Sequence, residues 1–145
     1  MAGSEPWITL KRDKKAAYEI FMDPGREVYL AIMEDEIAGF IVLILQGAFI
    51  GTIQSVFVVP EWRNRGIGRQ LMAHAEKCIL CQTPNVFICV SSFNKDALRL
   101  YQRLGYREVG ELKDYIVSGH SEILLRKTIA PLAAFKKREL DGWME

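Results

Sequence analysis

The feature that most constrains the fold is an apolar strand pattern that leads directly into a glycine-rich, basic loop and then into an amphipathic helix. The strand pattern covers residues 56–59, Pro60 ends it, and Gly66 and Gly68 precede the apolar periodicity of the helix. The first turn of a helix leaves backbone N–H groups unpaired and carries the positive end of the helix dipole. A phosphate group is therefore favoured at that point, and glycines let it approach the backbone closely because they have no Cβ. The same loop carries three arginines, Arg63, Arg65 and Arg69.

The composition limits the classes of partner. The chain has 145 residues, 50% of them hydrophobic, and its 19 basic and 18 acidic residues give a net charge of +1. This length suits one domain with a buried core, so we expect a single domain over residues 1–145. A nearly neutral chain has no global field that would attract nucleic acid or a membrane surface. No apolar run approaches the ~20 residues of a membrane helix, and we expect a cytoplasmic protein.

The cysteines favour burial over disulfide or metal chemistry. Three of them, Cys78, Cys81 and Cys89, form no disulfide framework and suit a reducing compartment. His74 lies one turn before Cys78, so three metal-capable side chains fall on one helix. A structural zinc site needs a fourth ligand, and we expect small buried side chains and no metal.

Hydrophobic periodicity predicts an α/β fold with a mixed, mostly antiparallel central sheet flanked by helices. A helical N-terminal segment (1–27) precedes a core (28–128) and a tail (129–145). Within the core, residues 28–33, 37–46 and 49–59 read as an antiparallel meander, followed by a helix over 66–81. A strand over 86–90, a helix over 94–104 and a final hairpin, 106–117 with 122–126, complete the order. The strand–helix–strand unit implies a parallel crossover.

Two motifs resemble one family. The spacing Arg63-x-x-Gly66-x-Gly68 fits neither a dinucleotide fingerprint nor a P-loop. It resembles the Gln/Arg-x-x-Gly-x-Gly/Ala signature of the GNAT family of N-acetyltransferases. The later stretch from Asn94 through Tyr101 to Tyr106 resembles the Asn-x-x-Ala-x-x-Leu/Phe-Tyr-x-x-x-Gly-Phe/Tyr pattern of the same family. The chain is similar to the members that acetylate ribosomal-protein alanine N-termini, and the likeness spans roughly residues 28–128.

The resemblance implies a site for acetyl-coenzyme A (acetyl-CoA) and no metal. In this family the strand before the loop pairs with the pantetheine arm, and the loop amides bind the pyrophosphate. Asn94 would hydrogen-bond the cofactor near its reactive end, would cap the following helix, or would do both. Tyr101 would be the general acid that protonates the departing thiolate. The remaining cofactor-binding residues are Val56, Phe57 and Val58 for the arm, and Asn64, Arg65, Gly66, Ile67, Gly68 and Arg69 for the pyrophosphate.

The acceptor and the general base are not specified by these motifs. The implied reaction is direct transfer of acetyl to a primary amine: a peptide N-terminus, a lysine or a small amine. Relatives place a glutamate base where this chain has Cys89, or early in the strand where it has Thr52 or Gln54. None of these serves as a base at neutral pH. The candidates that remain, each of which also suits a solvated or structural role, are Glu61, Glu111, Asp114, His120 and Glu122.

Two alternative functions and one assembly follow from the sequence. A CoA-binding sensor without turnover is favoured by the absent carboxylate base, whereas a nucleic-acid module using the arginines is disfavoured by the neutral charge. Family members usually begin with a strand and two helices, but only about 27 residues precede Val28, so a strand and helix look short or missing. The exposed sheet edge that results suggests a homodimer.

Overall fold

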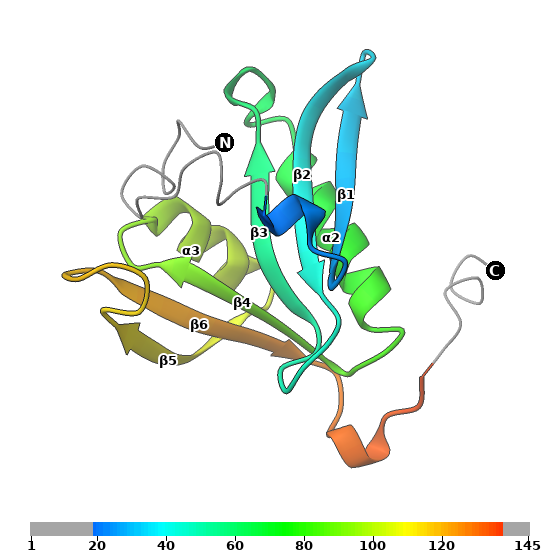
Figure 1. The fold of residues 1–145 in the computed structure, drawn as a ribbon, viewed down its shortest axis with the longest axis vertical. Coiled ribbons are helices and arrows are strands. Elements are labelled where there is room, and N and C mark those ends of the chain that lie inside the picture. The colour runs from blue at the N-terminus through cyan, green and yellow to red at the C-terminus, as the bar shows by residue number, and fades with distance from the viewer. Residues whose placement is uncertain (1–18, 138–145) are drawn as a thin grey trace.

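The computed structural model describes residues 19–137 (Figure 1). Residues 19–22 are helical, and most of the helical N-terminal segment expected over 1–27, like the tail beyond 137, lies outside the described residues. The strands are β1 (Arg26–Met33), β2 (Glu36–Ile44), β3 (Thr52–Val58), β4 (Asn85–Ser91), β5 (Arg107–Lys113) and β6 (Ser121–Thr128). The helices are α2 (Ile67–Ile79), α3 (Lys95–Arg103) and the short 3-10 turns η1 (Pro60–Trp62) and η2 (Leu132–Ala134).

The six strands form one mixed sheet in the order β1-β2-β3-β4-β6-β5. Neighbouring strands are antiparallel except β3 and β4, which are parallel and joined through α2. This confirms the α/β class and the mostly antiparallel sheet expected from the sequence. The crossover expected between the third and fourth strands is confirmed as well.

β3 and β4 are paired over a very short length. Their register joins Thr52 to Phe87 and Ile53 to Ile88. Beyond that point β3 continues to Val58 along β2, and β4 continues to Ser91 along β6. The two strands therefore diverge, which Figure 1 shows as a wedge between β3 and β4. The sheet opens at its centre, where a ligand can reach the backbone of β3.

Helix α2 covers one face of this sheet. Its buried stripe is formed by Ile67, Leu71, Met72, Ala75, Cys78 and Ile79, spaced so that they share one side of the helix. These side chains pack with buried residues of β2, β3 and β4 such as Ile41, Ile53 and Ile88. Cys78 and Cys81 are buried as expected, and Cys89 is half-buried. Within residues 19–137 no group of three or more His, Cys, Asp or Glu side chains is placed to hold a metal ion.

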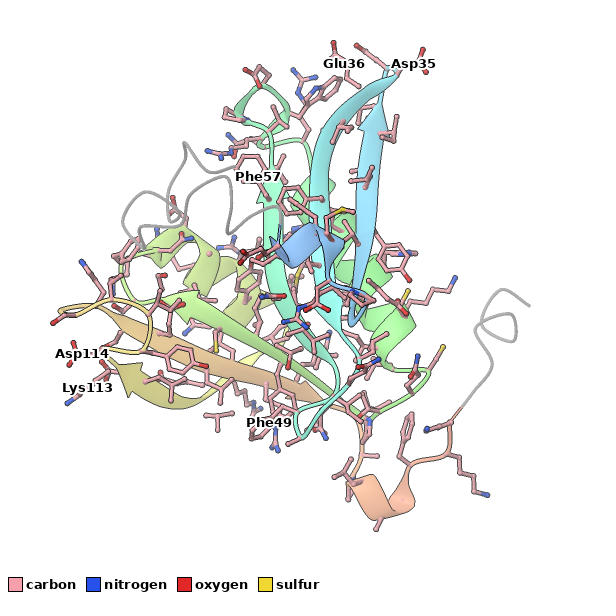
Figure 2. The ribbon with its side chains drawn as sticks, viewed as in Figure 1. Asp35, Glu36, Phe49, Phe57, Lys113 and Asp114 are labelled. Atoms are coloured by element: carbon pink, nitrogen blue, oxygen red, sulfur yellow. The ribbon has the colours of Figure 1, made fainter. Side chains whose placement is uncertain are left out.

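The start of β3 and the end of β5 differ from the sequence-based expectation. The third strand begins at Thr52 rather than Phe49, because Gly47 and Gly51 adopt positive φ angles of 91° and 94° and turn the chain. Phe49 consequently lies on an exposed loop (Figure 2). β5 ends at Lys113 rather than Val117, because Asp114 adopts a positive φ and its Oδ1 accepts a hydrogen bond from Gly119 N at 2.7 Å.

The described part of the tail, residues 129–137, contains the 3-10 turn η2. As for membrane insertion, no helix among residues 19–137 combines the length and apolarity that crossing a bilayer requires.

Candidate functional site

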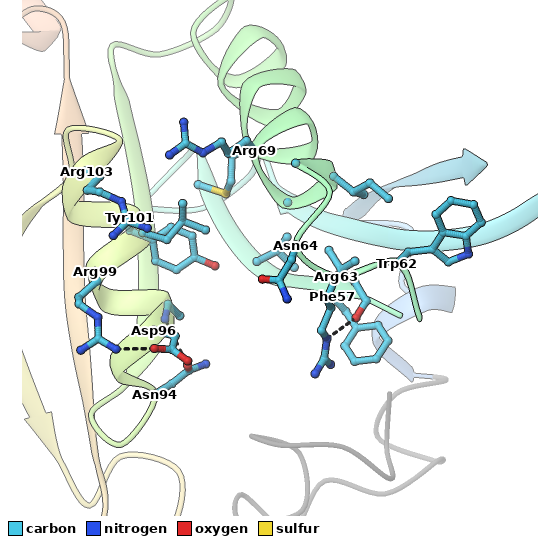
Figure 3. A pocket seen from close by; sticks show the side chains of 18 of the residues that line it. Phe57, Trp62, Arg63, Asn64, Arg69, Asn94, Asp96, Arg99, Tyr101 and Arg103 are labelled. Atoms are coloured by element: carbon cyan, nitrogen blue, oxygen red, sulfur yellow. Dashed lines mark hydrogen bonds and ion pairs between the residues drawn. The ribbon is translucent and has the colours of Figure 1, made fainter. Parts of the chain in front are cut away.

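A cleft of about 940 Å³ lies beside the diverging end of β3 (Figure 3). β3 and the loop to α2 form one wall, and the start and outer turns of α3 form the other. The structure brings together all but one of the predicted cofactor and catalytic residues along this cleft. These are Val56, Phe57, Val58, Asn64, Gly66, Ile67, Gly68, Arg69, Asn94 and Tyr101.

Arg65 is the exception. Its guanidinium lies over the Trp62 ring, 4.7 Å from the ring centroid, and its side chain does not line the cleft. A cation stacked on an aromatic face is stabilised by the ring quadrupole, which holds the side chain in that direction. The motif therefore predicted the position of this residue in the loop but not the direction of its side chain.

The loop ends in a helix start with an open backbone. Gly66 adopts the left-handed conformation, with φ of 82°, and precedes the first helical residue, Ile67. The first helical hydrogen bond runs from Gln70 N to Gly66 O, so the amides of the preceding turn have no partner within the helix. A Cβ added at Gly66 would meet no heavy atom within 4 Å, and one at Gly68 only Val58 Cγ2 at 3.9 Å. This helix start offers several backbone donors to an anionic group.

Arg63 fastens the loop to β3. Its Nε donates a hydrogen bond to Val58 O at 2.9 Å, and its guanidinium lies 5.6 Å from the centroid of the Phe57 ring (Figure 3). The sequence predicted that Arg63 adds positive charge to the phosphate site. In the structure its main contacts are with the strand end, so one backbone acceptor of that end is already paired.

The wall formed by α3 carries Asn94 and Tyr101. Asn94 is the N-cap, since its Oδ1 accepts a hydrogen bond from Ala97 N at 3.3 Å. The cap uses only the amide oxygen, and the same group carries two N–H donors on Nδ2. Tyr101 is 5% exposed, and its hydroxyl points from α3 into the cleft towards the side of Asn64 (Figure 3). Burial raises the pKa of Tyr101 well above its ordinary value, so the phenol keeps its proton at neutral pH.

A polar network behind Tyr101 was not predicted. Its ring packs edge-on against Tyr106, with centroids 6.1 Å apart. The Tyr106 hydroxyl donates to Glu76 Oε1 at 2.9 Å, and Lys127 Nζ lies 3.1 Å from Glu76 Oε2. Burial, together with the charge of Glu76, raises the pKa of Tyr106. The network links Glu76 of α2 and Lys127 of β6 to Tyr106, which follows α3. The Tyr106 ring, on which Tyr101 packs, is therefore held in place.

Two cationic residues of α3 were also missed. Arg99 and Arg103 line the cleft opposite Arg69 of α2, and Arg99 forms an ion pair with Asp96. The signal was present in the sequence, because positions 99 and 103 lie four apart on a predicted helix and therefore share one face. Their charges make the cleft suitable for an anionic ligand longer than a single phosphate.

None of the residues at the positions considered for a glutamate base, Thr52, Gln54 and Cys89, is placed to act as one. Thr52 Oγ1 donates to Phe49 O at 2.8 Å, and Gln54 Oε1 accepts from the Arg26 guanidinium. Burial, and secondarily the charge of Glu122, raise the pKa of the Cys89 thiol, so it stays protonated. Of the other candidates, Glu61, Glu111 and Asp114 are exposed, His120 is half-buried and Glu122 is buried on β6.

Comparisons with known proteins agree with this geometry. The family model described as the acetyltransferase (GNAT) domain matches residues 24–108, more than half of the chain. An N-alpha-acetyltransferase of Sulfolobus acidocaldarius is 26% identical over 114 residues, which cover 70% of this chain and 68% of that protein. Both solved structures described next are below 25% identity and show the shared fold.

The first is Arabidopsis thaliana NAA60 in complex with a bisubstrate analogue, with a TM-score of 0.69 and 19% identity. The match covers 81% of this chain and 86% of that one. The second is an aminoglycoside 6'-N-acetyltransferase complexed with coenzyme A, with a TM-score of 0.66, 24% identity and 83% of each chain covered.

Proposed function

The chain belongs to the GNAT acetyltransferase family, and we propose that it transfers acetyl from acetyl-CoA directly to a primary amine. The observation that carries the proposal is the cleft itself. An open helix start and cationic side chains lie along it, and a buried, protonated tyrosine points into it. An anionic, nucleotide-bearing thioester fits this combination of donors, charge and acid.

The residues along the cleft divide into binding and catalytic roles. The amides of residues 64–69 bind the pyrophosphate, and Gly66 and Gly68 admit it because the backbone there is open. Positive charge for the phosphate of acetyl-CoA that lies outside the pyrophosphate comes from Arg69, Arg99 and Arg103. The diverging edge of β3 at residues 56–58 pairs with the amides of the pantetheine arm, as an added strand pairs with a sheet edge. Asn94 donates from Nδ2 near the thioester.

Tyr101 is the general acid. The amine nitrogen forms a bond to the thioester carbonyl carbon, and the C–S bond then breaks. The phenol gives its proton to the thiolate sulfur, because burial keeps that proton in place until a strong acceptor develops beside it. The proton that the nitrogen loses after attack restores the phenol through solvent. The products are the N-acetylated amine and coenzyme A as a free thiol.

The acceptor is a primary amine, and we rank a peptide N-terminus first. An N-alpha-acetyltransferase is among the relatives that resemble this chain in sequence, over about two thirds of its own length. A small amine ranks second, since an aminoglycoside N-acetyltransferase shares the fold. The panel that decides between them contains tetrapeptides with a free N-terminus, Nα-acetyl-lysine amide and 2-aminoethylphosphonate.

The test combines calorimetric titration with acetyl-CoA and a thiol-release assay across the panel. We expect one binding site per chain and release of coenzyme A with at least one amine. Tyr101→Phe should lower kcat by about 10²–10³-fold and leave the Kd for acetyl-CoA unchanged. Tyr115→Phe is the matched control, because Tyr115 is 64% exposed on the β5–β6 loop and should behave as wild type.

A second candidate function is a CoA-binding sensor without turnover. It is favoured by one observation, the absence of a carboxylate at positions 52, 54 and 89. A sensor would bind acetyl-CoA with the same stoichiometry but release no thiol with any amine, and Tyr101→Phe would change nothing. That result would refute the transferase proposal and leave the binding site intact.

A further inference from the structure

Direct transfer requires that the amine lose a proton before it attacks. A lysine side chain with a pKa of about 10.4 and a peptide N-terminus with a pKa of about 8 are both mostly protonated at neutral pH. A protonated amine has no lone pair with which to attack a thioester. If the proposed function holds, the protein therefore needs a group that accepts this proton.

A buried polar pair lies at the ends of two paired strands. Ser91, the last residue of β4, is directly opposite Glu122 of β6, so the two side chains are neighbours on one face of the sheet. Ser91 is 3% exposed and Glu122 is 5% exposed. Cys89 lies on the same face, because side chains two residues apart along a strand point the same way. The pair is thus adjacent to Cys89, whose protonated thiol does not act as a base.

Ser91 shows that this spot is built for a further polar group. Its Oγ is buried and has no hydrogen-bond partner among the described residues. Buried hydroxyls in folded proteins are nearly always paired with protein, an ordered water or a ligand. A water or an amine N–H beside Glu122 would supply the partner that Ser91 lacks.

Short backbone connections join the pair to residues that line the cleft. Asn94 N donates to Ser91 O at 2.8 Å, and Phe93 and Asn94 both line the cleft. Ser92 N donates to the backbone oxygen of the residue before Glu122, at 2.9 Å. The Phe93 ring lies 5.2 Å from the His120 ring, two residues before Glu122. The start of β6 is therefore fixed against the wall of the cleft that carries Tyr101.

We propose that Glu122 accepts the proton of the acceptor ammonium, with the Ser91 hydroxyl holding the amine or the one water that relays the proton. The N–H bond of the ammonium breaks, its electron pair stays on nitrogen, and the proton binds the Glu122 carboxylate, which later returns it to solvent. The neutral nitrogen then forms the C–N bond, and Tyr101 protonates the sulfur as the C–S bond breaks. The second proton that the nitrogen loses restores the Tyr101 phenol through solvent. Acetyl-CoA and the ammonium become the acetylated amine, the free thiol and one proton in solution.

The groups that face Glu122 determine how the pH dependence of kcat/KM is interpreted. From β4 it is faced by Ser91 and by the protonated Cys89 thiol, and from β5 by the apolar Leu112. His120, in the turn that precedes β6, is a titratable group two residues before Glu122. A substitution at Glu122 thus removes the carboxylate from this face, and Cys89 offers a second position from which a carboxylate can reach the same spot.

The experiment compares two acceptors that differ in their need for a base. The first is the primary amine of the panel with the highest kcat/KM, and the second is hydroxylamine, which is already neutral at pH 7. Glu122→Gln should lower kcat/KM for the primary amine by about 10²–10³-fold and for hydroxylamine by only about threefold or less. The remaining activity with the primary amine should rise with pH in step with the fraction of neutral amine.

Three control measurements distinguish a proton-accepting role of Glu122 from a loss of structure in the variant. Glu122→Gln should bind acetyl-CoA with the wild-type Kd, and Glu108→Gln, an exposed position on β5, should keep the wild-type kcat/KM. The double variant Cys89→Glu with Glu122→Gln should recover at least about tenfold of the lost activity, because the carboxylate returns to the neighbouring position.

Three results would overturn the proposal. Glu122→Gln with wild-type kcat/KM and pH profile shows that another group accepts the proton, while the proposed function stands. An equal loss with hydroxylamine shows a structural role instead. A wild-type protein that releases no thiol with any amine refutes the proposed function, and this assignment with it.

Discussion

Gly66 and Gly119 form a matched pair that separates backbone strain from ligand binding. Their φ angles are 82° and 84°, and a Cβ added at either meets no heavy atom within 4 Å. Alanine in the left-handed region costs about 1–2 kcal/mol, and the lower entropy of the unfolded chain offsets about 0.4–1 kcal/mol of that. Both substitutions should therefore lower the free energy of unfolding by roughly 1 kcal/mol. Stability alone does not distinguish the two positions.

Affinity for acetyl-CoA should distinguish them. Gly66 immediately precedes the first turn of α2 in the cleft, whereas Gly119 lies on the β5–β6 loop. A methyl group at Gly66 stands on the open surface that a pyrophosphate must approach, and losing one hydrogen bond to a charged group costs about 1.5–3 kcal/mol. The Kd should rise about 10–100-fold for Gly66→Ala and stay within about twofold for Gly119→Ala. Strain cancels in this comparison, because the free and bound states both carry it.

The assay is calorimetric titration of both variants with acetyl-CoA, accompanied by urea unfolding at the same pH. Urea unfolding checks that both variants lose the same free energy of unfolding. The Kd from titration then shows the effect of each substitution on acetyl-CoA binding alone. Equal changes in Kd at the two positions would refute the assignment of the α2 start as the anion site. A Gly66→Ala variant with weakened stability and wild-type Kd would refute it equally.

Three further predictions concern the frame of the cleft. Burial raises the pKa of Tyr101, so above pH ~10 the folded state keeps a proton that the unfolded state releases, and stability present below that pH is lost as pH rises. Between pH 9 and 11 the free energy of unfolding should fall with pH less steeply in Tyr101→Phe than in the wild type. The two slopes should differ by up to ~1.4 kcal/mol per pH unit, and equal slopes would contradict this. Gly39→Ala places a Cβ against the backbone oxygen of Phe57 in β3 and should lower the free energy of unfolding by roughly 1–3 kcal/mol, as measured by urea unfolding. Gly110→Ala, which meets nothing within 4 Å, should cost little, and matching losses would argue against the clash. Lys127→Met removes the cation 3.1 Å from the Glu76 carboxylate, which is 17% exposed, and should lower stability by about 1–2 kcal/mol. An unchanged thermal midpoint would show that the pair contributes nothing.

The parts of the site that are local in sequence could be predicted from it. The loop glycines, the helix start after Gly66 and the cap at Asn94 depend on neighbouring residues, whose conformational preferences are strong. The third strand was extended too far because Phe49 and Ile50 continue an apolar pattern. The turn there depends on positive φ angles at Gly47 and Gly51, which apolar periodicity does not report.

The parts that depend on tertiary packing could not be predicted. Arg65 turns away from the cleft because it stacks on the Trp62 ring. The pairing of Glu76 with Tyr106 and Lys127 joins residues 30 and 51 positions apart, and no local pattern signals it. The Ser91–Glu122 pair depends on the register of β4 against β6, where a slip of one residue would place the two side chains on opposite faces.

The divergence of β3 and β4 gives a physical reason why the sequence specifies the cofactor half of this reaction more clearly than the acceptor half. The helix start and the helix cap that line the cleft, to which we assign the cofactor, are each encoded in a few consecutive residues beside the opening of the sheet. The face that carries Ser91 and Glu122 is assembled from alternate residues of paired strands, so its chemistry becomes visible only with the register. The pairing of β3 with β4 ends at residue 53, so the backbone of β3 beyond that point has no neighbouring strand among the described residues on this side. In the mechanism that we propose, the base is a carboxylate on β6, and Glu122 lies opposite Ser91, two residues from Cys89 on the same face. The proposed base therefore depends on strand register, whereas the motifs assigned to the cofactor depend on local sequence.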